Sequence, residues 1–398
     1  MKDWERKSLG EVCEIVNGST PLRSNKKFWE NGNFPWFTID DIREQGRIIS
    51  HTKQKVTEAA LSKLRVLPVD TVLLCCTASV GEYAITKIEL TTNQQFNGLV
   101  LKDRKKLDPE FLMHYCSTLK DKLLGLSGKT TIDFIAISKL KPLEIPLPPL
   151  PEQQRIVAIL DEAFAAIDKA KANAEQNLQN AKELFESYLQ GVFEKKGDDW
   201  EEKTLGELCT FTQGIQRGVK LQSETQEKGQ VRFLRIVDYT QGNEPPRYID
   251  FPGDKYVLNE EDVALVRYGA STGFVCQGMI GALANNLFRV IPKSHEALSN
   301  NFLAVYLRST VFQNVIKATM NGAAMPAISF GLIKEIPFPF PNLEEQQIII
   351  RKLSAVQSET QKLEAMYQKK INDLEELKKS ILQKAFAGEL ETEKAVTV

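Results

Sequence analysis

The chain has 398 residues, of which 42% are hydrophobic and 26% charged, so it is globular in composition and too long for one ordinary domain. It has no run of about 18 apolar residues, which excludes a membrane-spanning helix, and MKDWERKSLGE at the N-terminus lacks the apolar core of a secretion signal. We therefore expect a cytoplasmic protein. A net charge of −1 excludes a global positive field, so any nucleic-acid binding has to rest on local basic patches.

Cysteine and histidine usage argues against a metal centre. The six cysteines form no CxxC pair, and the three histidines, His51, His114 and His295, are isolated. Reduced, buried thiols are the default for such a pattern in the cytosol. The sequence therefore predicts no metal site.

Residues 1–150 predict a mixed α/β domain. Short β-like runs at 72–74 and 98–101 lie between Gly, Asn and Asp turns, and a helix is expected over 109–124. A polar, basic loop at 20–27 leads into WFTIDDIR at 36–43. The domain ends in the proline-rich stretch KPLEIPLPPLPEQQ, which favours an extended, semi-rigid connector.

Residues 151–194 predict one long helix, because the stretch is rich in Ala, Glu, Gln, Lys and Leu and has no proline after its first residue. Apolar or small residues recur in steps of three and four, which is typical of a coiled-coil seam. The seam positions are Ile156, Leu160, Ala163, Ile167, Ala170, Ala174, Leu178, Ala181, Phe185, Tyr188 and Val192.

The second half repeats this plan, with a domain at 195–343, a helix at 344–390 and a tail at 391–398. Its β-like runs lie at 232–237 and 263–266, and its domain helix is expected at 300–318. Each residue of the first long helix has its counterpart 193 positions later, without insertion or deletion. The second seam comprises Ile349, Leu353, Val356, Thr360, Leu363, Tyr367, Ile371, Leu374, Leu377, Ile381 and Ala385.

The globular parts are repeated too. Residues 4–18, WERKSLGEVCEIVNG, return at 200–214 as WEEKTLGELCTFTQG. We therefore predict an α+β protein with two mixed α/β domains, separated by two long helices that pair antiparallel as a coiled coil, with internal two-fold pseudosymmetry. The domains differ far more than the helices, which is typical of a fixed frame presenting two different recognition surfaces.

Catalytic motifs are missing. Gly128-Lys129-Thr130 ends like a phosphate-binding loop, but the earlier glycine that the motif needs is replaced by Leu123. The Asn-Pro-Pro-aromatic signature of adenine methyltransferases is interrupted at Asn243-Glu244-Pro245-Pro246. No Ser/His/Asp or Cys/His arrangement has sequence support. The sequence predicts a non-catalytic binding protein.

Polar and basic residues of the diverged loops are the candidates for DNA contact, because cations bind phosphates while amides, hydroxyls and arginines read base edges. An ordinary solvated loop position remains the alternative for each of them, and Trp36 fits a core position better than a base-stacking one. The candidates are Thr20, Arg23, Asn25, Lys26, Lys27, Thr38, Asp40, Arg43, Ser79, Lys129, Gln216, Arg217, Lys220, Arg235, Tyr239, Arg267, Tyr268, Ser271, Thr272 and Asn321.

The chain resembles the specificity (S) subunits of type I restriction–modification systems. The resemblance is carried by the twin proline-rich exits into EQQ, the twin helices, the repeated WxxxxLGE openings, and Thr92-Asn93-Gln94-Gln95-Phe96 with a weaker echo at Ala284-Asn285-Asn286-Leu287-Phe288. It implies two target-recognition domains, each reading one half of a split, asymmetric site in double-stranded DNA. The helices would be the spacer that docks two methyltransferase (M) subunits.

The resemblance also implies which activities lie elsewhere. The methyl donor, ATP and Mg²⁺ would be bound by the M subunits and the restriction (R) subunits, with no cofactor or catalysis in this chain. A coiled-coil scaffold whose domains bind proteins is the alternative, but it does not explain why the domains diverge around basic loops. An enzyme with fused nuclease or methyltransferase activity is disfavoured by the missing motifs.

Overall fold

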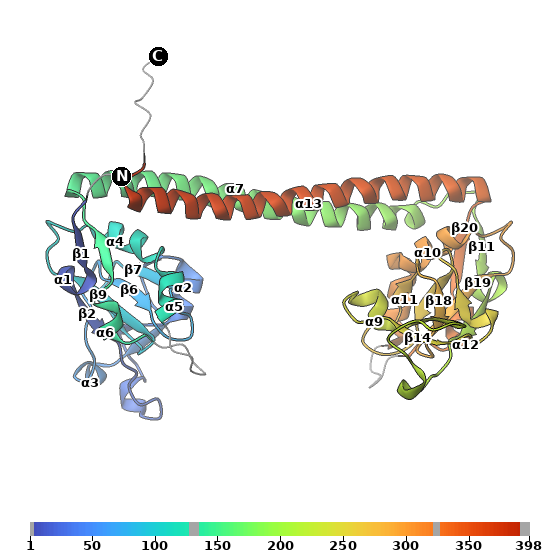
Figure 1. Ribbon diagram of the computed structural model, residues 1–398, viewed down its shortest axis with the longest axis horizontal. Helices are drawn as coiled ribbons and strands as arrows, with labels where there is room; N and C mark the ends of the chain where they lie inside the picture. The colour runs from blue at the N-terminus through green and yellow to red at the C-terminus, as the bar shows by residue number, and fades with distance from the viewer. Residues whose placement is uncertain (1–3, 127–134, 321–326, 391–398) are drawn as a thin grey trace, which may run out of the picture. The chain divides into compact units, whose positions relative to one another are not determined.

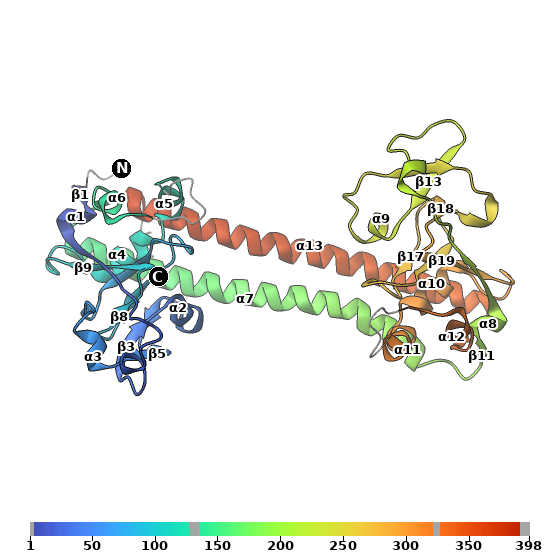
Figure 2. The same ribbon diagram turned by 90° about the horizontal axis from the view of Figure 1, so that it is seen from below.

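The computed structural model describes residues 4–126, 135–320 and 327–390. It divides into two compact units, Met1–Ala174 with Lys369–Val398, and Glu175–Gln368. Each unit therefore combines one globular domain with half of each long helix, α7 (Leu150–Glu194) and α13 (Leu343–Ala387) (Figures 1 and 2). Two mixed α/β domains and two long helices were predicted from the sequence, and both are confirmed.

The described residues of the first unit form three sheets. The largest has the order β2 (Cys13–Asn17), β9 (Phe96–Leu101), β6 (Val72–Cys75), β7 (Tyr83–Thr86) and β4 (Ile48–Ile49). A second has the order β5 (Gln54–Val56), β3 (Phe34–Phe37) and β8 (Thr91–Thr92), and β1 (Arg6–Ser8) pairs with β10 (Glu144–Pro146). The short helices are α1 (Leu9–Val12), η1 (Lys26–Phe28), α2 (Ile39–Gln45), α3 (Glu58–Leu61), α4 (Pro109–Cys116), α5 (Lys120–Leu126) and α6 (Ile137–Leu140).

The second unit repeats this layout with variations. One sheet has the order β12 (Cys209–Gln213), β19 (Leu287–Pro292), β16 (Val263–Val266) and β17 (Val275–Cys276). Another has the order β14 (Arg247–Asp250), β13 (Gln230–Leu234), β18 (Gly281–Leu283) and β15 (Val257–Leu258), and β11 (Glu201–Thr204) pairs with β20 (Pro337–Phe340). The short helices are α8 (Leu205–Leu208), η2 (Val219–Leu221), α9 (Ile236–Thr240), η3 (Asp254–Tyr256), α10 (Asn300–Arg308), α11 (Thr310–Met320) and α12 (Phe330–Lys334).

Three predicted elements are interrupted in the structure. The helices expected over 109–124 and 300–318 are each two helices, α4 with α5 and α10 with α11. The break falls at a serine in both units, where the hydroxyls of Ser117 and Ser309 donate to the carbonyls of His114 and Tyr306 at 2.5 and 2.6 Å. Such back-bonding competes with the helical ladder. The strand expected at 232–237 ends at Leu234, because the next residues begin α9.

The long helices run antiparallel within the first unit. Lys171 of α7 pairs with Glu375 of α13, and Asp168 pairs with Lys378, so moving back along one helix means moving forward along the other. In this unit Leu160, Ile167 and Ile371 are buried on the seam, and Ile381 is half-buried. No helix among the described residues is both long enough and apolar enough to cross a membrane.

In the second unit the seam contains Leu353, which is buried, with Leu178, Phe185 and Leu363 half-buried. Two positions that the spacing placed on a seam lie outside it, since Tyr188 is 37% exposed and, in the first unit, Leu377 is 47% exposed. Leu189 and Leu382 are buried instead, because these parts of the helices pack against the domains. Packing on the domain therefore overrides the coiled-coil period at the helix ends.

A buried glutamine joins each domain to its long helix. Gln153, at the start of α7, donates to the carbonyls of Pro148 and Lys106, both at 2.8 Å, and accepts from the Asp108 amide at 2.8 Å. Its counterpart Gln346, at the start of α13, does the same in the second unit. It donates to the carbonyls of Pro341 (2.9 Å) and Ala297 (2.7 Å) and accepts from the Ser299 amide at 3.0 Å.

Both glutamine side chains are fully buried. A buried donor left without its partner costs about 1–3 kcal/mol, so these amides hold the proline-rich connector, the helix start and the following domain segment as one rigid joint.

Matching aromatic contacts join each domain to the long helix that ends beside it, which is α13 in the first unit and α7 in the second. Phe386 of α13 packs on Phe111 and Tyr115 of α4, with ring centroids 5.1 and 5.3 Å apart. In the other unit, Phe193 of α7 packs on the rings of Phe302 (5.8 Å) and Tyr306 (5.4 Å) of α10. Aromatic burial of this kind is a large stabilising contribution. Each domain is thus attached to both helices.

The thiols are part of the core. All six cysteines are buried and free. Burial raises the pKa of Cys13 and of its repeat counterpart Cys209 to about 12, so both stay protonated at neutral pH. Their place on β2 and β12 agrees with the structural role expected from the sequence.

Candidate nucleic-acid interface

The basic loop of the first domain is held in shape by an arginine between two tryptophans. The guanidinium of Arg23 lies 3.9 Å from the ring centroid of Trp29 and 4.5 Å from that of Trp36, and it donates to Gln54 Oε1 at 2.7 Å. Stacking and hydrogen bonding of this kind restrict a side chain that is otherwise flexible. Arg23 therefore orders the loop, and Trp36 is buried as expected.

This ordered loop presents lysines at its tip, on η1. The Asn25 side chain accepts from the Lys27 amide at 3.2 Å and so caps the helix. Lys26 and Lys27 are exposed, and the Lys63 ammonium lies 5.0 Å from the centroid of the Phe28 ring. We call Lys26, Lys27 and Lys63 the basic tip. Among the described carboxylates, only that of Glu30 forms an ion pair with the basic tip, 3.2 Å from the Lys26 ammonium.

The loops after β2 and β12 each begin with a glycine, and this glycine lies very close to the turn that precedes β9 in the first unit and β19 in the second. A Cβ on Gly18 would lie 2.1 Å from the Asn93 carbonyl oxygen, and a Cβ on Gly214 would lie 2.1 Å from that of Ala284. Only glycine permits this approach. Asn93 thus corresponds to Ala284, so the echo of Thr92–Phe96 that was aligned from the sequence is displaced by one residue.

The turn after Asn93 places polar side chains beside the loop. The Thr20 hydroxyl donates to the exposed Gln94 side chain, and the Asn17 amide donates to Asn97 Oδ1 at 3.0 Å. In the second unit Gln213 takes the place of Asn17 and donates to the Asn285 carbonyl at 2.9 Å. Gln94 is absent from the candidates chosen by sequence, although the motif that carried the resemblance contains it.

Helix α2 holds three of the candidates in different environments. Thr38 is buried at its N-terminus, where its amide donates to Asp41 Oδ2 at 2.7 Å, so its side chain belongs to a helix cap. Asp40 and Arg43 are exposed and pair with each other at 2.8 Å. Arg43 also lines a hollow of about 440 Å³ with Ser79 and Lys120.

Two arginines of the second domain are occupied by neighbouring groups. Arg235 contacts the buried Asp238 through Nε at 3.1 Å and Nη2 at 3.2 Å, and it donates to the Pro245 carbonyl at 2.8 Å. Arg267 donates to the Gln213 side chain and to the Ile328 carbonyl, the latter at 3.3 Å. Both side chains brace loops within the domain.

The remaining candidates of the second domain fall into two groups. Gln216, Arg217 and Lys220 are exposed on the loop that contains η2. Tyr239, Tyr268, Ser271 and Thr272 are half-buried, and the Thr272 hydroxyl donates to the Gly269 carbonyl at 2.6 Å. Lys129 and Asn321 lie outside the described residues.

Chemically, each unit offers exposed cations and amides on loops outside its sheets. The described residues contain no group of three or more His, Cys, Asp or Glu side chains placed to hold a metal ion. Such loops can bind phosphates and base edges.

Comparison with known proteins identifies the family. Residues 1–178 and 197–375 each match the type I restriction modification DNA specificity domain. The chain belongs to this family. Its role therefore lies in DNA sequence recognition within a type I restriction–modification system.

Relatives in this family match nearly the whole chain or about half of it. The type I restriction enzyme MjaIX specificity subunit of Methanocaldococcus jannaschii is 27% identical over 420 residues, which cover 98% of this chain and 94% of that protein. The type I restriction enzyme EcoprrI specificity subunit of Escherichia coli is 32% identical over 218 residues, covering 52% of this chain and 54% of that protein.

Solved structures share the fold. A chain from a study of complex assembly and conformational transition of the type I R-M system superposes with a TM-score of 0.81 at 22% identity, covering 98% of this chain and 99% of that one. The crystal structure of the HsdS subunit from Thermoanaerobacter tengcongensis gives a TM-score of 0.63 at 22% identity, covering 98% of both chains.

Proposed function

We propose that each globular domain of this specificity-family chain reads one half of a bipartite, asymmetric DNA site. The observation that supports this most directly is the contrast between frame and loops. The two units share their glutamine joints, aromatic contacts and glycine approaches, whereas the loops that start at Gly18 and Gly214 carry different side chains. Unlike loops on like frames serve two different half-sites.

Within the first domain, the basic tip and the turn at Gln94 are the proposed contact surface. Lysines bind phosphates without regard to sequence, while Gln94 and Arg43 have the amide and guanidinium groups that read base edges. Thr38 and Arg23 brace the loops of this domain, since their polar groups already have partners in it, and Arg235 and Arg267 do the same in the second domain.

A salt-dependent gel shift tests this assignment, using the chain together with its M partner. Replacing Lys26 and Lys27 by Ala should weaken binding of specific and non-specific DNA alike. It should also reduce the slope of log affinity against log salt by about one for each phosphate that is no longer neutralised. The matched control replaces Lys105 and Lys106, two adjacent exposed lysines of the same unit. Equal weakening in both double variants would contradict DNA binding at the basic tip.

We also propose that the long helices dock two M subunits, which supply methyl transfer, while R subunits supply ATP-dependent cleavage. Leu184 of α7 and Leu377 of α13 occupy the same repeat position and are 52% and 47% exposed. Leu184 borders a groove of about 390 Å³ that continues past Tyr188 to Lys195. Exposed apolar residues repeated once in each unit fit two copies of one partner.

Replacing both Leu184 and Leu377 by Asp should abolish assembly with the M subunit, because a carboxylate would be buried in an apolar contact. Replacing Leu184 alone should leave a complex with a single M subunit. Light scattering of the purified complex distinguishes these masses. Ala172→Asp with Ala365→Asp is the control, since both alanines are exposed and also share a repeat position. Assembly of the double leucine variant with two M subunits would refute this docking site.

A further inference from the structure

The two units differ where domain, α7 and α13 meet. In the first unit, the buried His114 of α4 contacts Asp161 Oδ1 of α7 at 2.8 Å. Phe164 packs against the His114 ring at 5.6 Å, and the Lys378 ammonium lies 4.6 Å from the centroid of Phe164. Burial lowers the pKa of His114, so the neutral ring donates to the Asp161 carboxylate at neutral pH. This unit fills the junction with its own side chains.

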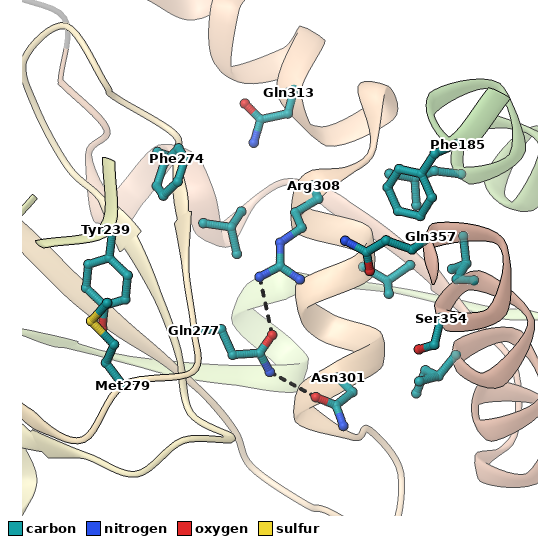
Figure 3. Close-up of a pocket in the computed structure, with 15 residues that line it drawn as sticks. Phe185, Tyr239, Phe274, Gln277, Met279, Asn301, Arg308, Gln313, Ser354 and Gln357 are labelled. Carbon is teal, nitrogen blue, oxygen red and sulfur yellow. Dashed lines mark hydrogen bonds between the residues drawn. The ribbon is translucent and has the colours of Figure 1, made fainter. Parts of the chain in front are cut away.

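In the second unit the same positions carry different residues. Val305 stands where the first unit has His114, and Ser354 and Gln357 stand where it has Asp161 and Phe164. These smaller or uncharged residues line a cavity of about 770 Å³ (Figure 3). Sites for small organic ligands have volumes of about 300–1,000 Å³, so the cavity is large enough for one.

The cavity has one charge and several amides. Arg308, at the end of α10, is the single charged residue among those that line it, and its Nη2 donates to Gln277 Oε1 at 3.3 Å (Figure 3). Gln277 donates in turn to Asn301 at 2.9 Å. No described carboxylate forms an ion pair with Arg308. Its planar group of donors is therefore available to an anion, and guanidinium matches carboxylate geometry well.

The rest of the lining is apolar and aromatic. Phe185 and Phe274 contribute rings, and Val305 contributes aliphatic surface. The Tyr239 hydroxyl is buried and has no hydrogen-bond partner among the described residues. The apolar lining, the Arg308 cation and the unpartnered Tyr239 hydroxyl together suit a ligand that has an apolar body and an anionic group.

We propose that this cavity binds a carboxylate carried on an aromatic or similarly bulky apolar group, with Arg308 holding the carboxylate. The first unit places the Asp161 carboxylate at the matching junction, whereas the second unit has Ser354 there and takes the carboxylate from outside. The carboxylate comes either from a free small acid or from an acidic side chain of a bound peptide. The cavity shares no lining residue with the groove at Leu184 that is proposed to dock the M subunit.

Isothermal titration of the full chain with N-acetyltryptophan tests the proposal. We expect a dissociation constant of about 0.1–1 mM, as for a ligand of this size with one charged contact. The neutral N-acetyltryptophanamide should bind at least tenfold more weakly. A capped tryptophan–glutamate dipeptide, with tryptophan–glutamine as its control, distinguishes the sources. Tighter binding of the glutamate peptide than of the free acid indicates a peptide side chain, and the reverse order indicates a small acid. Acids that bind no better than their neutral counterparts overturn the proposal.

Two variants locate the site. Arg308→Gln should lower the affinity at least tenfold by removing the cation. Ser354→Asp should do the same by supplying the carboxylate from within, and its exposed position on α13 tolerates the change. Lys317→Gln, an exposed charge change on α11 away from the cavity, should leave the affinity unaltered. Wild-type affinity in both Arg308→Gln and Ser354→Asp would exclude this cavity.

Discussion

Adding one helical turn at matching points of α7 and α13 should widen the unread gap in the DNA site by one to two base pairs. Insertion of four residues after Ala174 and after Tyr367, which share a repeat position, lengthens each helix by about 6 Å. Base pairs are about 3.4 Å apart, which gives the expected change. The gap is measured by mapping methylated adenines in DNA from cells that carry the complete system.

The control for this experiment is an insertion in α7 alone. It puts the parts of α7 before and after the insertion out of register by a full turn, so the seam that holds the Lys171–Glu375 and Asp168–Lys378 pairs and the seam of the second unit cannot both be kept. Methylation should then disappear or be strongly reduced. If the double insertion supports methylation with the original gap, the helices do not set the spacing.

Exchanging residues 1–150 for those of another family member should change one half of the recognised sequence and leave the other half intact. Methylation at the original site should be lost completely, because a single mismatched base pair costs about 1–3 kcal/mol of binding free energy and a new half-site differs at several base pairs. The same methylation mapping detects it. The reciprocal exchange of residues 195–343 should change the other half alone. A change in both halves after either exchange would contradict independent reading.

The two long helices could be predicted because the sequence contains the same helical pattern twice. A period of three and four residues over 151–194, repeated without a gap, fixes both the helices and most of their seam. Tyr188 and Leu377 fit the period equally well but are exposed, because the domains contact the helix ends and bring Leu189 and Leu382 inside. A helical pattern cannot show where a domain covers it.

The recognition loops could be predicted only as sets of residues. Arg23 and Arg235 are as basic in sequence as Lys27, yet one lies between two tryptophans and the other on a buried aspartate. Those partners follow from the path of the loop. The cavity of the second unit was not predicted. Ser354 and Val305 suggest a cavity only when they are compared with Asp161 and His114, which occupy the same positions in the first unit.

The glutamine joint bears on how such proteins acquire new specificities. Gln153 and Gln346 each bond to two main-chain carbonyls and one main-chain amide, and Gln346 also accepts from the Ser299 hydroxyl at 3.2 Å. A foreign domain therefore has to match the backbone path at this joint, and its own helix has to keep the aromatic contacts that α4 and α10 make with the long helices. Under the proposed function, exchange of a domain between relatives that keep this joint is expected to change one half-site while the long helices stay the same.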